Sequence, residues 1–396
     1  MDLTIKNITE VFQTRFSAEP LFIRSPGRVN LIGEHTDYNS GFVLPAAIDK
    51  SIVLAIAPNT RNKIRLHAVD VDQGAFETEI SGNYERSDSP WANYILGVVD
   101  ELNKAGRTIS GFDCAFGGNI PIGAGLSSSA ALEGGVIYGL SKLFDLNLTP
   151  MQMTLLAQKA ENRFVGVQCG IMDQFANLLG KENHVMKLDC RSLDYQYVPF
   201  ANSSINIVLC DTNVRRELAT SEYNVRRSQC EQAVGIMQKS MPFIQSLRDV
   251  SASLLETFKA ELDQVVYKRC LYVIEENQRV LDACDDLRGN DMISFGKKMY
   301  QSHYGLRDQY EVSCKELDIL VEATENLEGV LGSRMMGGGF GGCSINLVLQ
   351  ENMDQVLKEL KKEYFEKTEL ELTTHTAKIG EGTHSFSLGN EVLDDK

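Results

Sequence analysis

The chain has 396 residues, and its 43% hydrophobic and 23% charged residues are typical of an ordinary globular protein. This length is too great for one ordinary core, so it predicts two domains. The formal net charge of −15 argues against nucleic acid as a partner, because there is no basic excess to offset repulsion by phosphates.

The N-terminal residues predict a short helix over residues 4–16, with Ile5, Ile8 and Phe12 on one face. This stretch is charged and lacks the apolar centre of a secretory signal, and no later segment reaches transmembrane length. We therefore expect no membrane partner. The nine cysteines are scattered without a C-x-x-C pair, which is typical of reduced thiols, so we expect a cytoplasmic protein.

The stretch from Arg24 to Asn39 begins as a strand and ends in a strongly polar loop. In the strand, side chains alternate between two faces. The loop then crowds together five hydrogen-bonding side chains, which are Glu34, His35, Asp37, Tyr38 and Asn39. Carboxylates, imidazoles and amides in such number suit a polyhydroxylated ligand such as a sugar. A solvated loop between two strands would show the same pattern.

Two strands, over residues 51–57 and 63–69, precede a helix predicted over residues 90–104. The helix carries Trp91, the only tryptophan of the chain. Core packing is the usual role of such an aromatic side chain.

A loop rich in glycine and serine, Gly123–Ser129, lies between a strand at 112–116 and a helix at 130–144. Gly123 and Gly125 allow the main chain to turn tightly and to approach a ligand closely. The first turn of the helix offers unpaired N–H groups and the positive end of its dipole, and the serine hydroxyls could donate to phosphate or bind Mg²⁺. The loop predicts a phosphate site, although an ordinary serine-capped helix has a similar composition.

Two carboxylates follow at a spacing of twelve positions. Thr149 and Pro150 predict the start of a helix that ends near Glu161, and Asp173 comes after a glycine-containing turn. One carboxylate could hold a metal ion while the other faces a substrate hydroxyl. Asp173 would also serve as a simple helix cap.

The C-terminal half is mostly helical in pattern, and we place the domain boundary at residues 200/201, giving domains 1–200 and 201–396. Residues 218–227 begin a long helix, in which Tyr223 would be a core aromatic and Arg226–Arg227 a solvated, ion-paired face. Further helices are predicted over residues 252–262, 271–283, 291–301, 315–325 and 353–364. The glycines at 337–342, before a buried strand at 344–349, indicate a close approach of main chain to a ligand or another loop.

Four of these strings, Arg24–Asn39, Pro121–Glu133, Leu218–Arg227 and Ser333–Cys343, closely resemble the motifs of galactokinases, members of the GHMP small-molecule kinase superfamily. The resemblance covers most of the chain. It implies an α/β (α+β) fold of two lobes with the active site between them and a ferredoxin-like C-terminal lobe. It also implies ATP-dependent phosphorylation of the C1 hydroxyl of α-D-galactose, giving galactose 1-phosphate and ADP at the start of galactose catabolism by the Leloir pathway.

Carried over residue by residue, the resemblance implies catalytic roles for Asp173, at the reacting hydroxyl, and for Arg28 beside it. The implied sugar contacts are Glu34, His35, Asp37, Gly170, Asp173 and Tyr223. The implied ATP contacts are Trp91, Gly123, Ala124, Gly125, Leu126, Ser127, Ser128 and Ser129. Mg²⁺ is the implied cofactor, held by Ser129 and Glu161, and galactose and ATP are the expected partners of a monomeric protein.

Two alternatives remain open at this point. The chain could be another sugar 1-kinase of the same superfamily, acting on N-acetylgalactosamine or arabinose, because pocket shape decides between such sugars. It could also be a non-catalytic regulator that senses galactose and ATP. Loss of a phosphate-loop serine or of the aspartate would favour the regulator, but Ser127, Ser128, Ser129 and Asp173 are all present.

Overall fold

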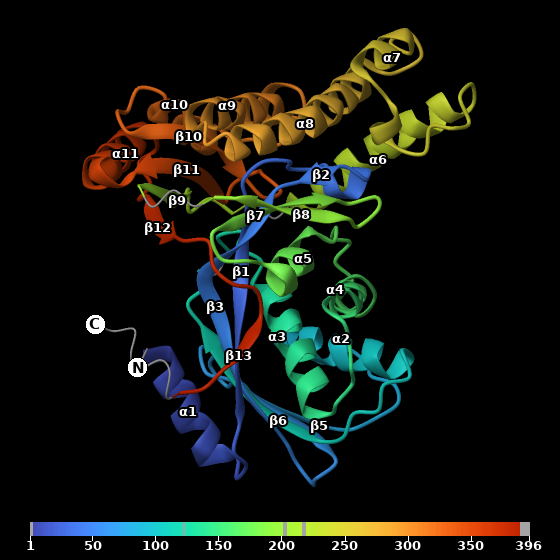
Figure 1. Ribbon diagram of the computed structural model, residues 1–396, viewed down its shortest axis with the longest axis vertical. Coiled ribbons are helices and arrows are strands. Elements are labelled where there is room, and N and C mark those ends of the chain that lie inside the picture. The colour runs from blue at the N-terminus through green and yellow to red at the C-terminus, as the bar shows by residue number, and fades with distance from the viewer. Residues whose placement is uncertain (1–2, 122, 201–203, 216–218, 389–396) are drawn as a thin grey trace.

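The computed structural model describes residues 3–121, 123–200, 204–215 and 219–388, and Figure 1 shows its two lobes. A six-stranded sheet organises one lobe and a four-stranded sheet the other, with a small sheet of β2 (Phe42–Val43), β7 (His184–Asp189) and β8 (Tyr195–Pro199) between them. Helices and sheets are mixed throughout, so the predicted α/β class is confirmed. In the described part of the chain, no helix is long and apolar enough to span a membrane.

The N-terminal lobe is built on a sheet of strand order β13-β1-β3-β6-β4-β5. Its strands are β1 (Leu21–Asn30), β3 (Pro45–Pro58), β4 (Lys63–Ala68), β5 (Ala75–Glu79), β6 (Phe112–Gly118) and β13 (His384–Phe386). The helix α1 (Leu3–Arg15) covers one face (Figure 1). The other face carries α2 (Pro90–Lys104), α3 (Ser128–Leu143), α4 (Pro150–Lys159) and α5 (Met172–Leu179).

Local sequence signals account for several of these helix starts. Pro90 and Pro150 stand at the first helical positions, where the missing N–H costs nothing and the fixed φ suits a helix. Thr149 and Gln152 form a reciprocal capping box at the start of α4. The helices predicted over residues 4–16 and 90–104 are both confirmed, within one residue at each end.

The C-terminal lobe has a four-stranded antiparallel sheet of order β10-β11-β9-β12. Its strands are β9 (Ile205–Asp211), β10 (Val330–Met336), β11 (Cys343–Leu349) and β12 (Thr373–Ala377). The helices α6 (Ala219–Gln238), α7 (Ala252–Thr257), α8 (Gln264–Arg288), α9 (Met292–Asp308) and α10 (Lys315–Thr324) separate β9 from β10, and α11 (Met353–Thr368) separates β11 from β12. This strand–helix–strand–strand–helix–strand order is the ferredoxin-like arrangement that was expected.

One hydrophobic cluster extends through both lobes. This buried cluster contains Val29 from the end of β1, Leu31 directly after it, Val280 from α8 and Ile345 from β11. Because β1 enters this cluster as it leaves the N-terminal sheet, the polar loop after β1 lies where the lobes meet.

The chain crosses between the lobes a second time near its C-terminus, where β13 pairs antiparallel with β1. The last described strand therefore belongs to the N-terminal sheet. The boundary at residues 200/201 stays a prediction.

Some local predictions were wrong. The helix expected over residues 252–262 ends at Thr257, and the one expected over 271–283 is the longer α8. Arg226 is not on a solvated face: it is 6% exposed and donates to the carbonyl oxygens of Tyr310 at 2.8 Å and Glu311 at 2.7 Å. Arg227 does lie at the surface, where it pairs with Glu231 at 2.9 Å.

Candidate active site

A cavity of about 380 Å³ opens between the lobes, beside the end of β1 and the start of α5. Seven residues predicted from the sequence to act on a sugar line it: Arg28, Glu34, His35, Asp37, Gly170, Asp173 and Tyr223. The remaining lining comes from Gly166, Val167, Gln168, Cys169, Met172, Asn224, Gly337 and Gly338. Residues from both halves of the chain therefore converge on one hollow.

Arg28 and Asp173 form a two-pronged ion pair at this cavity. The Arg28 Nε atom donates to Asp173 Oδ1 at 2.7 Å, and Nη2 donates to Oδ2 at 2.9 Å. Burial by itself lowers the pKa of Arg28, but the Asp173 carboxylate, with help from Glu34 and Asp37, raises this pKa above its ordinary value. Arg28 is therefore a permanent positive charge beside the Asp173 carboxylate.

The same arginine joins this pair to the glycine- and serine-rich loop. Its Nη1 atom donates to the Gly125 carbonyl oxygen, and its main-chain N–H donates to the Leu126 oxygen at 3.1 Å. The Ser127 hydroxyl donates to Asp173 Oδ2. Ser127 has φ of 56°, a left-handed conformation that is costly for a residue with a side chain and that often marks a functional site.

The loop presents main chain more than side chains to a ligand. Ala124 and Leu126 are buried in the core, so only their main-chain groups can reach a phosphate. Helix α3 begins at Ser128, and its first turn offers the unpaired N–H groups expected of an anion site.

The C-terminal lobe holds the polar loop in place through Arg334, whose role was not predicted from the sequence, and through Gly337, in the glycine stretch for which a close approach of main chain was predicted. The fully buried Arg334 of β10 donates to Glu34 Oε1 at 3.1 Å, to the Leu31 oxygen at 2.8 Å and to the Asn30 oxygen. The Gly337 N–H donates to the same Glu34 atom at 2.9 Å. Glu34 therefore enters the cavity with a fixed orientation.

His35 is neutral and immobilised. Burial, together with the charge of Arg226, lowers its pKa to about 3. Its Nδ1 atom shares a hydrogen bond with the Tyr38 hydroxyl at 2.7 Å, and Tyr38 in turn bonds the Tyr310 hydroxyl at 2.9 Å. The Tyr223 ring packs 5.4 Å from the His35 ring and 4.9 Å from the Tyr38 ring, so Tyr223 joins this aromatic group and also lines the cavity.

Asp37 and Gly170 are in direct contact in the wall of the cavity. A Cβ atom on Gly170 would stand 1.8 Å from Asp37 Oδ2, so this close approach needs glycine. Burial, followed by the charges of Asp173 and Glu34, raises the pKa of Asp37 to about 6, although a hydrogen bond from the Tyr38 main chain opposes the shift.

Glu161 lies in a π-helical turn, Ala160–Val165, that follows α4. Its Oε2 atom accepts a hydrogen bond from Gln174 at 2.7 Å. Burial and the Asp173 charge raise the pKa of Glu161, whereas a hydrogen bond from Ser129 lowers it. The fully buried Glu133 lies behind, 3.4 Å from the Gln174 amide.

The Ser129 hydroxyl and the Glu161 carboxylate are oxygen donors that fit Mg²⁺ bound together with a nucleotide. Hydroxyl and carboxylate oxygens are the ligands that Mg²⁺ prefers, and the ion usually takes its remaining ligands from phosphates and water. The described residues contain no cluster of three or more His, Cys, Asp or Glu side chains that could hold a metal ion.

A further cation, not anticipated from the sequence, contacts the predicted phosphate loop, Gly123–Ser129. A Cβ atom on Gly123 would lie 2.8 Å from the Arg215 Nε atom, so the guanidinium lies against Gly123. Arg215 is half exposed and is paired with Asp211 at 2.6 Å. Because it follows β9, it brings a charge from the C-terminal lobe.

Trp91 lies partly buried in the N-terminal lobe, with its ring 5.5 Å from Phe116 and 6.3 Å from Phe76. Core packing accounts for these contacts. The nucleotide contact expected at Trp91 stays a prediction.

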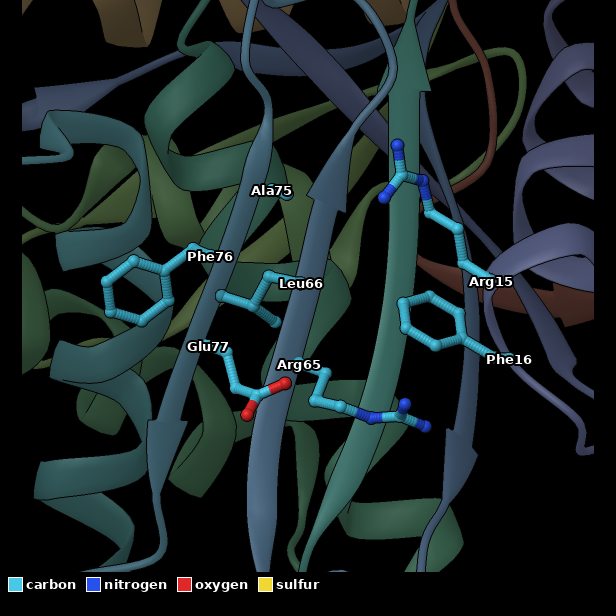
Figure 2. Close-up of a pocket in the computed structure, with 7 residues that line it drawn as sticks. All are labelled: Arg15, Phe16, Arg65, Leu66, Ala75, Phe76 and Glu77. Carbon is cyan, nitrogen blue, oxygen red and sulfur yellow. The ribbon is translucent and has the colours of Figure 1, made fainter.

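Figure 2 shows a second cavity, of about 430 Å³, over β4 and β5 and beside the end of α1. Two of its three charged side chains are already paired: Arg65 with Asp113 at 2.5 Å, and Glu77 with Lys63 at 2.5 Å. The Arg65 guanidinium also lies over the Phe16 ring. None of its seven lining residues is among the sugar, ATP or metal contacts predicted from the sequence.

Comparison with known proteins identifies the chain at the level of family. The galactokinase galactose-binding signature matches residues 10–58, the GHMP kinase N-terminal domain matches residues 93–181, and the GHMP kinase C-terminal domain matches residues 282–367. A galactokinase from Roseiflexus sp. (strain RS-1) is 43% identical over 95% of each chain, and one from Fusobacterium nucleatum is 41% identical over 96% of this chain and 97% of its own.

The chain belongs to the galactokinase family. A crystal structure of Lactococcus lactis galactokinase complexed with galactose superposes with a TM-score of 0.93 at 36% identity, covering 96% of this chain and all of the other. Methanococcus jannaschii mevalonate kinase, at 19% identity and a TM-score of 0.64, shares the fold. As a galactokinase family member with both GHMP domains, the chain is an ATP-dependent sugar kinase.

The raised pKa of Asp37 predicts a pH-dependent sugar affinity in this galactokinase family member. As the pH falls through about 6, Asp37 gains a proton and loses the charge that strengthens hydrogen bonds from sugar hydroxyls. We expect the Kd for galactose, measured by calorimetry, to rise several-fold between pH 7.5 and pH 5. The Asp37→Asn variant should bind more weakly and show a flat profile; an unchanged pH dependence in that variant would exclude Asp37 as the titrating group.

Proposed function

We propose that the chain transfers the γ-phosphate of ATP to the C1 hydroxyl of α-D-galactose. The observation that supports this most directly is the Arg28–Asp173 pair, which faces a polar cavity on one side and is bonded to the phosphate loop on the other. A sugar hydroxyl in the cavity and a phosphate on the loop would then meet at Asp173.

In this proposal Asp173 accepts the proton of the reacting hydroxyl, and Arg28 fixes the carboxylate and stabilises the negative charge of the transferring group. Phosphoryl transfer depends mainly on positioning and charge stabilisation, because its transition state is loose. The role of Asp173 is therefore both to orient the hydroxyl and to receive its proton.

The phosphates of ATP would lie on the loop Gly123–Ser129. The N–H groups of this loop and of the first turn of α3 would donate hydrogen bonds to the phosphate oxygens. Ser129 and Glu161 would hold Mg²⁺, which neutralises phosphate charge when bound. Arg215 would add a cation from the C-terminal lobe. These local positive groups would overcome the net charge of −15.

The sugar would be oriented by the polar loop after β1. Glu34 and Asp37 would accept hydrogen bonds from its hydroxyl groups, and neutral His35 and Tyr223 would line its other side. All nine cysteines are free thiols, which supports work in the reducing cytoplasm. The monomeric state stays a prediction.

The proposal is tested by ADP release with Mg-ATP and a panel of galactose, glucose, N-acetylgalactosamine and arabinose, with a blank lacking sugar. We expect galactose-dependent turnover well above the others. Faster turnover with another sugar would reassign the substrate. Absence of turnover, with galactose still raising the melting temperature, would favour the sensing role.

Asp173→Asn should lower turnover by at least about 10³-fold, because the amide cannot accept the proton and pairs poorly with Arg28. Galactose affinity should change only a few-fold, since the other sugar contacts remain. Steady-state kinetics and calorimetry measure the two effects, with exposed Asp145→Asn as a control. Near-normal turnover would refute the role of Asp173.

Arg215→Met should raise the KM for ATP and lower kcat, together by about 10- to 100-fold in kcat/KM, because a cation at the phosphate loop is lost. Arg215→Lys should retain part of the activity. Galactose affinity should not change in either variant. The matched control is Arg227→Met, which removes a surface arginine that is also paired with a carboxylate; equal effects at both positions would contradict a role at the phosphates.

A further inference from the structure

The segment between β12 and β13, which returns from the C-terminal lobe, contacts the C-terminal end of α5, the helix that carries Asp173. Figure 1 shows this segment descending from β12 to β13 beside β1. Two of its N–H groups bond main-chain carbonyls at the end of α5: Thr383 donates to the Asn177 oxygen at 2.8 Å, and Gly382 donates to the Gly180 oxygen at 3.0 Å. The last turn of a helix leaves such carbonyls unpaired, so the segment completes α5.

Behind α5, three buried side chains form a closed ring of hydrogen bonds. Asn177 Nδ2 donates to the Ser25 hydroxyl oxygen at 2.9 Å, and the Thr383 hydroxyl donates to Asn177 Oδ1 at 2.8 Å. Ser25 and Thr383 hydroxyl oxygens are 3.0 Å apart. Because Asn177 Oδ1 can only accept, this arrangement has the Thr383 hydroxyl donating to Asn177 and the Ser25 hydroxyl donating to Thr383, so every donor in the ring has an acceptor.

This ring touches each element that carries a reacting group. Asn177 lies one helical turn after Asp173, and its Nδ2 atom also donates to the Pro26 oxygen at 2.6 Å, two residues before Arg28. A Cβ atom on Gly134 would stand 1.8 Å from Asn177 Oδ1, so the amide also packs against α3, which begins at the phosphate loop. The elements carrying Asp173, Arg28 and the phosphate loop therefore meet at Asn177.

We propose that Thr383 is a positioning residue for phosphoryl transfer, an inference that rests on the proposed function. Its hydroxyl closes the ring and so holds α5 in place against β1. This position of α5 keeps both Asp173 carboxylate oxygens bonded to Arg28. Thr383 does not line the cavity, so it acts through Asn177 and Ser25. Displacing a reacting group by about 1 Å can cost about 100-fold in rate.

Thr383→Val tests this directly, because valine keeps the shape of threonine but cannot donate to Asn177. In the full chain with Mg-ATP and galactose, we expect kcat to fall by about 10- to 100-fold, with both KM values within about threefold of the parent. Thr383→Ser should restore most of the rate, since it restores the hydroxyl. Ser385→Ala, at an exposed position of β13 two residues after Thr383, should leave the rate unchanged.

Ser25→Ala removes the member of the ring that β1 contributes, and it is the test variant if Thr383→Val does not fold. We expect it to give the same loss of kcat. An unchanged kcat in the folded variants, or a loss that only follows their unfolded fraction, would overturn the proposal. A crystal structure of Thr383→Val gives a readout independent of substrate: the Arg28 Nε to Asp173 Oδ1 distance should lengthen beyond 2.7 Å. Inactivity of the parent chain with galactose would count against the proposed function alone. An unchanged Arg28–Asp173 distance in the Thr383→Val structure would count against the positioning role.

Discussion

The ion pair between Arg28 and Asp173 is the interaction on which the rest of the site depends. A buried charge pair is tolerated only when its geometry is good and its remaining hydrogen-bonding groups are satisfied. Here the guanidinium meets both carboxylate oxygens and the Gly125 carbonyl, and Ser127 adds a donor to the carboxylate. Strand β1, helix α5 and the phosphate loop are therefore fixed relative to one another by the two groups that are proposed to act on the substrate.

The C-terminal lobe contributes to this arrangement more than a wall for the cavity. Arg334 fixes Glu34, and the Glu276 carboxylate accepts from the Gly33 N–H at 2.9 Å, so the polar loop takes its shape from α8 and β10. Arg215 brings a cation to Gly123 from beyond β9. The segment that returns from the C-terminal lobe is bonded at Thr383 to the end of α5. A site assembled in this way loses its geometry when either lobe is disturbed, even by changes that do not touch a ligand.

The family, the mixed two-lobe fold and the gathering of seven sugar-site candidates could be predicted from the sequence, because their signals are local strings of residues. Pro90 and the Thr149–Pro150 pair marked helix starts for the same reason. Arg334, Arg215 and Thr383 were missed because their partners lie far away in the chain, so no local pattern records them. Arg226 was misjudged similarly: two adjacent arginines are typical of a surface, but the carbonyls of Tyr310 and Glu311 arrive from a distant turn.

The central claim is that the cavity brings the anomeric hydroxyl of galactose to Asp173 and to the terminal phosphate of ATP. The most direct test is phosphorus NMR of the product formed from Mg-ATP and α-D-galactose by the full chain. The account predicts a single new sugar phosphate whose phosphorus couples to the anomeric proton in the α configuration. A phosphate on another hydroxyl, or ADP formed without any sugar phosphate, would contradict it.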